Sequence, residues 1–192
     1  MWRHLPNLIT AMRMALVWPV FWLISQSEFG LALLLAALAG ISDALDGWLA
    51  KRFNWQSRLG GLMDPLADKL LLLAGFTGLA AIGEVPYWLL FMVIGRDLVI
   101  VCGAVLYHNL IGPFDAQPSR LSKLTTVVQI LFVLADLLRL AWAPGLPWRN
   151  VLLGLTALLT VASGLHYVLV WSLRARRELL ERKRRKEPTH VV

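Results

Sequence analysis

Residues Ser42–Lys69 read SDALDGWLAKRFNWQSRLGGLMDPLADK, a stretch that carries four aspartates and joins two apolar runs. Asp43 and Asp46 are three residues apart, and Asp64 and Asp68 are four apart. On helices these spacings put each pair on one face. A carboxylate on an apolar helix is costly to bury at membrane depth, so it indicates a functional site. Helix capping or pairing with a basic residue explains one such aspartate more easily than all four.

Small residues continue the face of each acidic pair at a spacing of four: Gly47 and Ala50 after the first pair, and Gly60 before the second. This pattern predicts a slot in which a bulky ligand lies against helix backbone. Four carboxylates in one cleft cannot all stay ionised unaided, and divalent cations remove the conflict. An all-oxygen ligand set favours Mg²⁺ or Mn²⁺ over zinc, and a pair of such ions suits a diphosphate.

The composition around this stretch is that of a polytopic membrane protein. Hydrophobic residues make up 58% of the 192 residues and charged residues 16%, against about 25% charged in a typical soluble domain. Such a chain is too apolar to be disordered or to fold as a soluble globule. The single cysteine, Cys102, excludes a disulfide-stapled module and sits inertly in an apolar run. At about 20 residues per span, the chain has room for roughly six transmembrane helices.

Six apolar segments are separated by short breaks rich in Gly, Pro and Ser, so neighbouring helices are expected to be antiparallel. No cleavage site follows the first segment, which Arg13 interrupts, so we do not expect it to be a signal peptide. Residues Met1–Pro6 are expected to form a short interfacial piece. The predicted spans are Leu8–Ser25, Phe29–Trp48, Gly61–Gly83, Tyr87–Tyr107, Ser122–Trp142 and Val151–Leu173.

The charges of the loops predict the orientation. Basic residues gather in the loop between the second and third segments, near the start of the fifth segment and after the sixth, which puts these regions and both termini in the cytoplasm. The chain divides into a six-helix domain over 1–173 and a basic tail over 174–192. That tail contacts anionic headgroups or serves only as a topology signal. It accompanies no nucleic-acid-binding motif, so no nucleic-acid partner is expected.

The aspartate stretch resembles the signature of the CDP-alcohol phosphotransferase family, D-x2-D-G-x2-A-R-x8-G-x3-D-x3-D. Every spacing fits, although Lys51 stands where the family has arginine, and either Lys51 or Arg52 could contact phosphate. Pro6–Thr10 with Arg13 resembles the family's opening segment, and Asp64–Lys69 resembles the same block in the family's bacterial phospholipid branch. The signature positions in this chain are Asp43, Asp46, Gly47, Ala50, Lys51, Gly60, Asp64 and Asp68.

The resemblance implies an all-α, six-helix membrane bundle, a homodimer, and transfer of a phosphatidyl group from CDP-diacylglycerol to a hydroxyl with release of CMP. It also implies the inner membrane of a bacterium, with the active site cytoplasmic. Asp43, Asp46 and Asp64 would be metal ligands, and Asp68 the fourth ligand and general base. The CDP-binding residues implied are Asp43, Asp46, Gly47, Ala50, Lys51 and Gly60.

The acceptor is either phosphatidylglycerol, giving cardiolipin, or glycerol-3-phosphate. Gly95–Asp97 and Ser122–Gln129 resemble the cardiolipin synthases more closely, which favours phosphatidylglycerol. An anionic acceptor could be gathered by four basic residues, Arg13, Arg96, Arg120 and Lys123. Alternatively, Arg13 or Arg96 pairs with an acid such as Asp97 or a cleft aspartate.

Asp136 and Arg139 are three residues apart and are expected to pair, and His166 is interpreted as a core residue. An intramembrane prenyltransferase would also hold a diphosphate with aspartates and Mg²⁺, but its aspartates are spaced differently. A transporter is the alternative outside this chemistry, although neither inverted repeats nor broken helices are evident.

Overall fold

The computed structural model describes residues 5–53, 58–111, 119–142 and 148–186, and the side chains of 10–43, 63–106, 119–142, 148–174 and 176. Within these ranges the chain forms six helices and no strand, as predicted. Each helix overlaps one of the six predicted spans. The helices are α1 (Leu5–Ser25), α2 (Phe29–Phe53), α3 (Arg58–Ala81), α4 (Tyr87–Ile111), α5 (Arg120–Trp142) and α6 (Arg149–Lys186).

The apolar content of these helices marks an integral membrane protein. Three described segments are long and apolar enough to cross a bilayer: Tyr87–Leu106, Arg120–Trp142 and Arg149–Arg174. Helices α1 and α2 contribute shorter apolar stretches, Thr10–Ser25 and Phe29–Asp43. Their apolar stretches are shorter because polar and charged residues occupy the remaining turns of the same helices.

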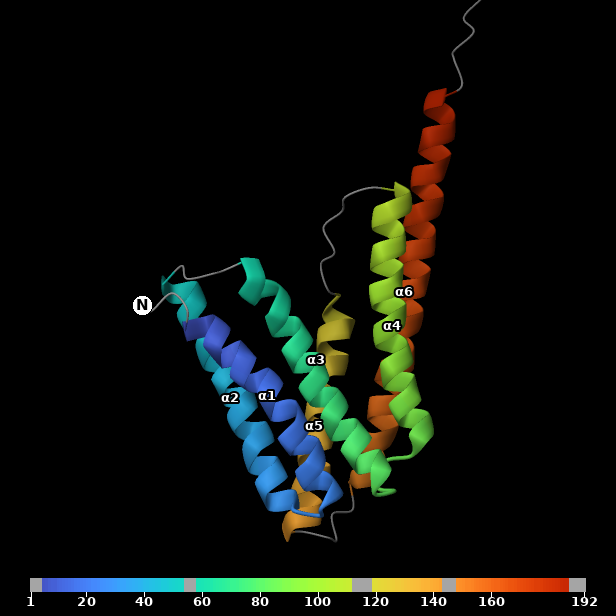
Figure 1. Ribbon diagram of the computed structural model, residues 1–192. Coiled ribbons are helices and arrows are strands. Elements are labelled where there is room, and N and C mark those ends of the chain that lie inside the picture. The colour runs from blue at the N-terminus through green and yellow to red at the C-terminus, as the bar shows by residue number, and fades with distance from the viewer. Residues whose placement is uncertain (1–4, 54–57, 112–118, 143–147, 187–192) are drawn as a thin grey trace, which may run out of the picture.

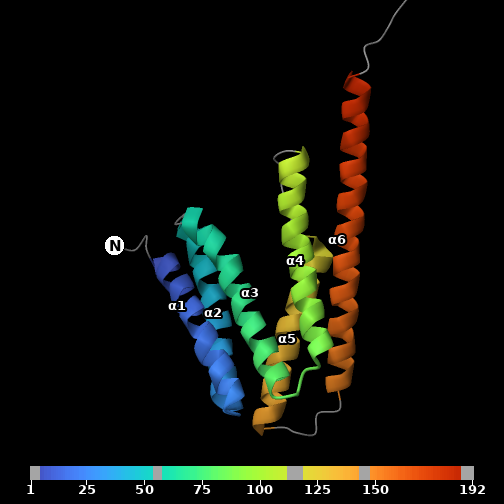
Figure 2. The ribbon, with the colours of Figure 1, turned by 45° about the vertical axis from the view of Figure 1, so that its right-hand side comes forward.

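Helices α1, α2 and α3 form one group and α4, α5 and α6 another. The two groups converge at one end of the molecule (Figures 1 and 2). Helix α1 packs on α2 and α3, α4 packs on α6, and α5 contacts α2, α3 and α6. We call the end where α1 turns into α2 and α3 turns into α4 the turn end. At the opposite end, α3 and α4 diverge (Figures 1 and 2).

Close helix contacts hold the two groups together near the turn end. Phe76 of α3 stacks on Phe132 of α5, with ring centroids 5.8 Å apart, and both side chains are buried. A Cβ atom at Gly75 would lie 2.7 Å from Val133 Cγ1, so only glycine allows α3 to approach α5 this closely.

Helices α5 and α6 are also joined by a buried polar seam. Gln129 Nε2 donates a hydrogen bond to Thr160 Oγ1 at 3.0 Å, and Thr125 Oγ1 donates to the Leu159 carbonyl at 3.2 Å. Small and polar side chains that hydrogen-bond across helices are a usual means of association in a bilayer, where apolar burial gives little driving force. The seam fixes the position of α6 against α5.

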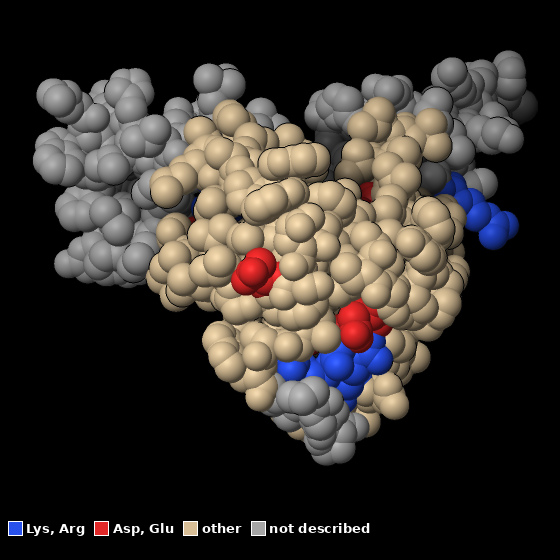
Figure 3. Space-filling model, turned by 60° about the horizontal axis from the view of Figure 1, so that its bottom comes forward, with Lys and Arg blue, Asp and Glu red and all other residues tan. Residues whose placement is uncertain are grey.

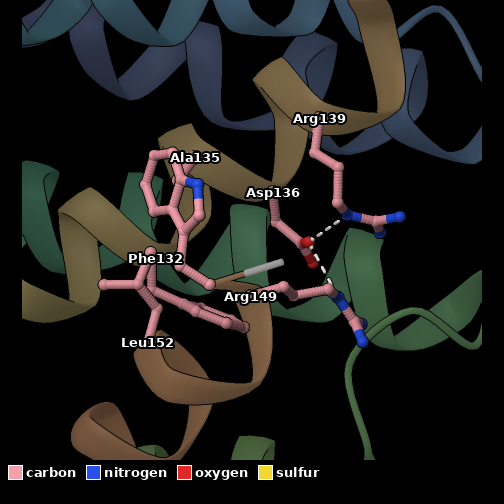
Figure 4. A pocket seen from close by; sticks show the side chains of 7 residues that line it. Phe132, Ala135, Asp136, Arg139, Arg149 and Leu152 are labelled. Atoms are coloured by element: carbon pink, nitrogen blue, oxygen red, sulfur yellow. Dashed lines mark hydrogen bonds and ion pairs between the residues drawn. The ribbon is translucent and has the colours of Figure 1, made fainter. Parts of the chain in front are cut away.

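Four charged side chains form a second cluster at the turn end, which we call the turn-end cluster: Glu84, Asp136, Arg139 and Arg149. Asp136 Oδ1 accepts hydrogen bonds from Arg139 Nε at 2.8 Å and from Arg149 Nε at 3.0 Å (Figure 4). Both arginines also contact the Glu84 carboxylate. Seen from this end, most of the surface around the few charged side chains is uncharged (Figure 3). The predicted Asp136–Arg139 pair is confirmed, within a larger network that ties the α3–α4 turn to α5 and α6.

The structure differs from the sequence predictions at two helix ends and at one predicted core residue. Helix α1 begins at Leu5, three residues before the predicted span, and residues 1–4 of the predicted interfacial piece lie outside the described residues. Helix α6 continues to Lys186, well into the region interpreted as a tail. His166 is exposed on α6 and does not belong to the core.

Candidate functional site

The Arg13 guanidinium lies between two of the predicted site aspartates. Arg13 Nη1 is 2.5 Å from Asp68 Oδ1 and 2.6 Å from Asp43 Oδ1. The arginine side chain is 2% exposed, whereas the two aspartates are 39% and 46% exposed. A buried cation from α1 therefore joins α2 and α3, and its two acidic partners still face open space.

Thr10, one helical turn before Arg13, contacts the third described aspartate. Its hydroxyl donates a hydrogen bond of 2.5 Å to Asp64 Oδ1. Thr10 is fully buried, and residues three apart on a helix share a face. One face of α1 thus contacts three of the four predicted aspartates. We call the region around Asp43, Asp64 and Asp68 the aspartate end.

The remaining members of the predicted signature lie outside the described side chains. Helix α2 continues through Phe53 and helix α3 begins at Arg58, so the spacing argument for shared helix faces applies to all four aspartates. The positions whose side chains the structure does not describe are Asp46, Gly47, Ala50, Lys51, Arg52 and Gly60.

The described residues fit a divalent cation by their chemistry. As they stand, no three acidic, histidine or cysteine side chains in the described part of the chain are close enough to hold a metal ion. However, the groups available are carboxylate oxygens, which hard cations such as Mg²⁺ prefer. A positive charge, that of Arg13, already lies between Asp43 and Asp68. This corner of the bundle therefore suits a cation that adds to, or exchanges with, the guanidinium.

A cavity of about 470 Å³ opens from these aspartates along α2, α3 and α5. Arg13, Asp43 and Asp68 line its polar part. The rest of the wall is apolar and comes mainly from small residues of α2 and branched residues of α3 and α5, such as Ala36, Leu72 and Val133. The cavity thus combines a charged corner with an apolar groove.

Arg96 is held by one acid and two hydroxyls rather than left open to a ligand. Its guanidinium lies 2.6 Å from Asp97 Oδ1 and donates to Ser122 Oγ at 2.5 Å and to Ser163 Oγ at 3.0 Å. Asp97 in turn lies 3.2 Å from the ammonium group of Lys69, the residue after Asp68. The pairing with Asp97 is one of the two roles expected for Arg96, and it links the aspartate end to α4, α5 and α6.

The other two candidate acceptor residues lie at the start of α5. Arg120 and Lys123 are both exposed. They are not brought into contact with the aspartates by any bond among the described residues, so their predicted role remains a hypothesis.

Sequence reasoning missed several polar partners of the site: Thr10, Lys69, Ser122 and Ser163. For Thr10 a signal was available, because Thr10 and Arg13 are polar residues three apart in an otherwise apolar helix. The partners of Arg96 come from helices 26 and 67 residues away in the chain, which no local pattern could reveal.

Comparison with known families gives one match that covers most of the chain. Residues 3–162 match the family described as CDP-alcohol phosphatidyltransferase. This range contains all four aspartates, Arg13, Arg96 and Asp97. It ends within α6, before the basic residues at the end of that helix.

Similar curated proteins carry two kinds of name. A human protein named cardiolipin synthase (CMP-forming) is 34% identical over 149 residues, covering 69% of this chain and 50% of the human one. A Streptomyces coelicolor protein of the same name is 39% identical over 130 residues, covering 64% and 59%. A Mycobacterium tuberculosis protein named probable phosphatidylglycerophosphate synthase is 31% identical over 172 residues, covering 86% and 80%. The chain thus spans little more than half the length of the first two relatives.

Proposed function

Since this chain belongs to the CDP-alcohol phosphatidyltransferase family, we propose that it transfers the phosphatidyl group of CDP-diacylglycerol to an alcohol hydroxyl and releases CMP. The observation that carries this proposal is the cavity between α2, α3 and α5. Its charged corner suits a diphosphate, and its apolar groove suits the acyl chains of a lipid donor. A soluble donor has no acyl chain to occupy that groove.

Divalent metal is general in this family, and the donor set at the aspartate end fits it. We assign Asp43, Asp46, Asp64 and Asp68 as the residues that would hold Mg²⁺ or Mn²⁺, in two sites. Bound there, the ions would neutralise the diphosphate and stabilise the charge on departing CMP. Arg13 contributes a fixed positive charge in the same corner and limits how far Asp43 and Asp68 can move apart.

Asp68 is the residue we assign to the proton of the attacking hydroxyl. Arg13 engages its Oδ1, so Oδ2 is the oxygen that would accept the proton. The acceptor oxygen forms a bond to the phosphorus that carries the diacylglycerol, the bond from that phosphorus to the CMP oxygen breaks, and CMP leaves with the electron pair. Because an ordinary carboxylate is a weak base, most of the acceleration comes from positioning and charge neutralisation.

Phosphatidylglycerol is the acceptor that we favour, with cardiolipin as the product. Two of the four candidate cations, Arg13 and Arg96, are already engaged by aspartates. The remaining positive charge suits a phosphodiester with one negative charge better than the more highly charged glycerol-3-phosphate. The names of the human and Streptomyces relatives agree with this choice. The name of the Mycobacterium relative favours the other acceptor.

The test is to give purified protein CDP-diacylglycerol with each acceptor separately and to measure CMP and lipid products. Cardiolipin from phosphatidylglycerol supports the full proposal. Product only from glycerol-3-phosphate would replace the acceptor and leave the donor and aspartates unchanged. Substrate flux across vesicles without CMP release would favour the transporter alternative.

The orientation and assembly are also proposals. Lys51 and Arg52 lie in the last turn of α2, and Arg58 begins α3, at the aspartate end. By the charge rule for membrane proteins, this end faces the cytoplasm. We propose that the protein resides in the inner membrane of a bacterium and forms a homodimer, as its resemblance to the family implies. The division into a catalytic domain over 1–173 and a basic tail over 174–192 remains a prediction, although helix α6 crosses that boundary without a break.

A further inference from the structure

A second apolar cavity continues the groove that starts at the aspartates. It measures about 340 Å³ and is lined by Leu33 of α2, several leucines of α5, and Trp148 with Leu152 at the start of α6. Leu134 lines both cavities. On α2, Leu33 lies three and four residues from Ala36 and Ala37, which line the first cavity, so it follows them on the same face. The two cavities therefore lie end to end between α2 and α5.

The groove has a definite length. Its wall on α2 runs from Asp43 to Leu33, ten residues apart in the sequence. At 1.5 Å per residue this is about 15 Å, or roughly half of a hydrocarbon core that is about 30 Å thick. A single leaflet has about the same depth, so the groove can hold most of one extended acyl chain.

The polar start of the groove identifies the kind of occupant. Arg13, Asp43 and Asp68 line one end, and apolar side chains line the remainder. An occupant of the whole groove needs a charged group at one end and an apolar body. A lipid with its phosphates at the aspartates has this form. A transmembrane helix of a second copy would be too wide to lie inside cavities of this volume.

Trp148 lines the far end of the groove, at the start of α6, and is 48% exposed. Its carbonyl accepts a hydrogen bond from Leu152 N at 3.0 Å, which ties it to the first turn of α6. It also lines the small cavity of the turn-end cluster, together with Asp136 and Arg149. Figure 4 shows Ala135, Leu152 and the ion pairs of that cluster gathered around this cavity. The Trp148 indole therefore lies between the apolar groove and the turn-end cluster.

We infer that one acyl chain of the lipid donor lies in the α2–α5 groove and that Trp148 closes its far end, so that Trp148 limits the length of chain the protein accepts. This inference rests on the proposed function and adds a specificity-determining residue to it. The chain starts at the aspartates, which lie well inside α2 rather than at its end. A longer chain would therefore reach Trp148 before it reached the turn-end surface.

The experiment compares dilauroyl, dipalmitoyl and diarachidoyl CDP-diacylglycerol as donors and measures kcat/KM from CMP release. We expect the wild type to use the diarachidoyl donor least well. In Trp148→Ala, the ratio of kcat/KM for the diarachidoyl donor to kcat/KM for the dipalmitoyl donor should rise by about tenfold. This is the scale on which apolar pockets discriminate chain length. Trp88→Ala is the matched control, because Trp88 is an exposed tryptophan at the same end of the molecule but does not line the groove.

A second variant tests the groove from the opposite direction. Ala37→Phe should block it partway and shift the preference toward the dilauroyl donor, whereas Leu38→Phe, at the neighbouring exposed position, should not. Equal chain-length profiles in Trp148→Ala and Trp88→Ala, or in the two phenylalanine variants, would overturn the inference and leave the proposed function standing. Absence of CMP release from every donor in the wild type would overturn both.

Discussion

The aspartate end and the turn-end cluster both contain carboxylates and arginines, but they differ in the ratio of negative to positive charge. At the turn-end cluster, Glu84 and Asp136 face two arginines, and the charges cancel. At the aspartate end, one arginine, Arg13, joins Asp43 and Asp68, and Asp64 accepts a hydrogen bond from Thr10. The cavity beside the turn-end cluster holds about 10 Å³, room for one water, whereas the one at the aspartates holds about 470 Å³.

This difference separates a structural use of buried charge from a chemical one. A charge-balanced network holds helices together without positive charge from outside. An excess of acid beside an open cavity needs positive charge from outside, which divalent ions and their substrate can supply. The comparison predicts that changes at the two ends affect different measurable properties.

The largest expected effect is that of Asp68→Asn on turnover. The variant keeps the shape of the side chain but cannot accept the hydroxyl proton or neutralise a metal ion, so CMP release should fall at least about a hundredfold. The thermal midpoint should change little, because Arg13 retains Asp43 as a partner. A variant with normal turnover would show that the chemistry lies elsewhere.

Asp136→Ala should do the opposite. Removing this acid leaves Arg139 and Arg149 without their shared partner and should destabilise the fold by about 2 kcal/mol. This is less than the ~3–5 kcal/mol of a fully buried pair, since Arg149 and Glu84 are 26% and 31% exposed. Thermal unfolding in detergent measures the loss, and CMP release per folded molecule should stay within about twofold of wild type. A selective loss of turnover at unchanged stability would remove the distinction between the two ends.

A smaller effect is expected at Thr10, which acts through Asp64. Thr10→Val preserves the shape of the side chain but removes the hydrogen bond to Asp64 Oδ1. Groups that orient a metal ligand are worth about tenfold or more in metal affinity. The Mg²⁺ concentration for half-maximal activity should rise by that factor, and Thr10→Ser should restore it. A Thr10→Val variant with the wild-type Mg²⁺ requirement would show that this bond does not orient the ligand.

The smallest effect concerns the basic end of the chain. Deleting residues 182–192 removes five basic residues that follow one another, Arg182 to Lys186. One contact of about 1 kcal/mol with an anionic surface corresponds to roughly fivefold. Activity in phosphatidylserine-containing vesicles should fall by about that factor, with little change in neutral detergent. Equal losses in both media would indicate a structural role for this part of α6.

The fold was predictable from the sequence because hydropathy and breaks between apolar runs act locally. The helix ends were less so. Residues 174–186 were interpreted as a tail since they are charged, yet Arg, Glu, Leu and Lys are all good helix formers, and α6 simply continues through them. The aspartate pairs were predictable because each lies within one helix, at a spacing that a helix turns into proximity.

The partners of the buried cations were not predictable in the same way. Arg13 meets acids that lie 30 and 55 residues later in the chain, and Arg149 meets Glu84 across 65 residues. The sequence indicated only that Arg13 and Arg96 needed a partner or a ligand. The partners of Arg13 and Arg96 depend on how α1 packs on α3 and how α4 packs on α6. This packing is determined by contacts along whole helices.

The most direct test of the account is Mn²⁺ binding measured by electron paramagnetic resonance on the purified wild type, Asp43→Asn/Asp68→Asn and Asp136→Asn. The first variant removes charge at the aspartate end, and the second removes charge at the turn-end cluster. We predict that the wild type and Asp136→Asn bind Mn²⁺ alike, and that the double variant loses binding while it remains folded. Mn²⁺ binding that survives in the double variant, or that is lost in Asp136→Asn, would contradict the assignment of the aspartate end as the metal-dependent site.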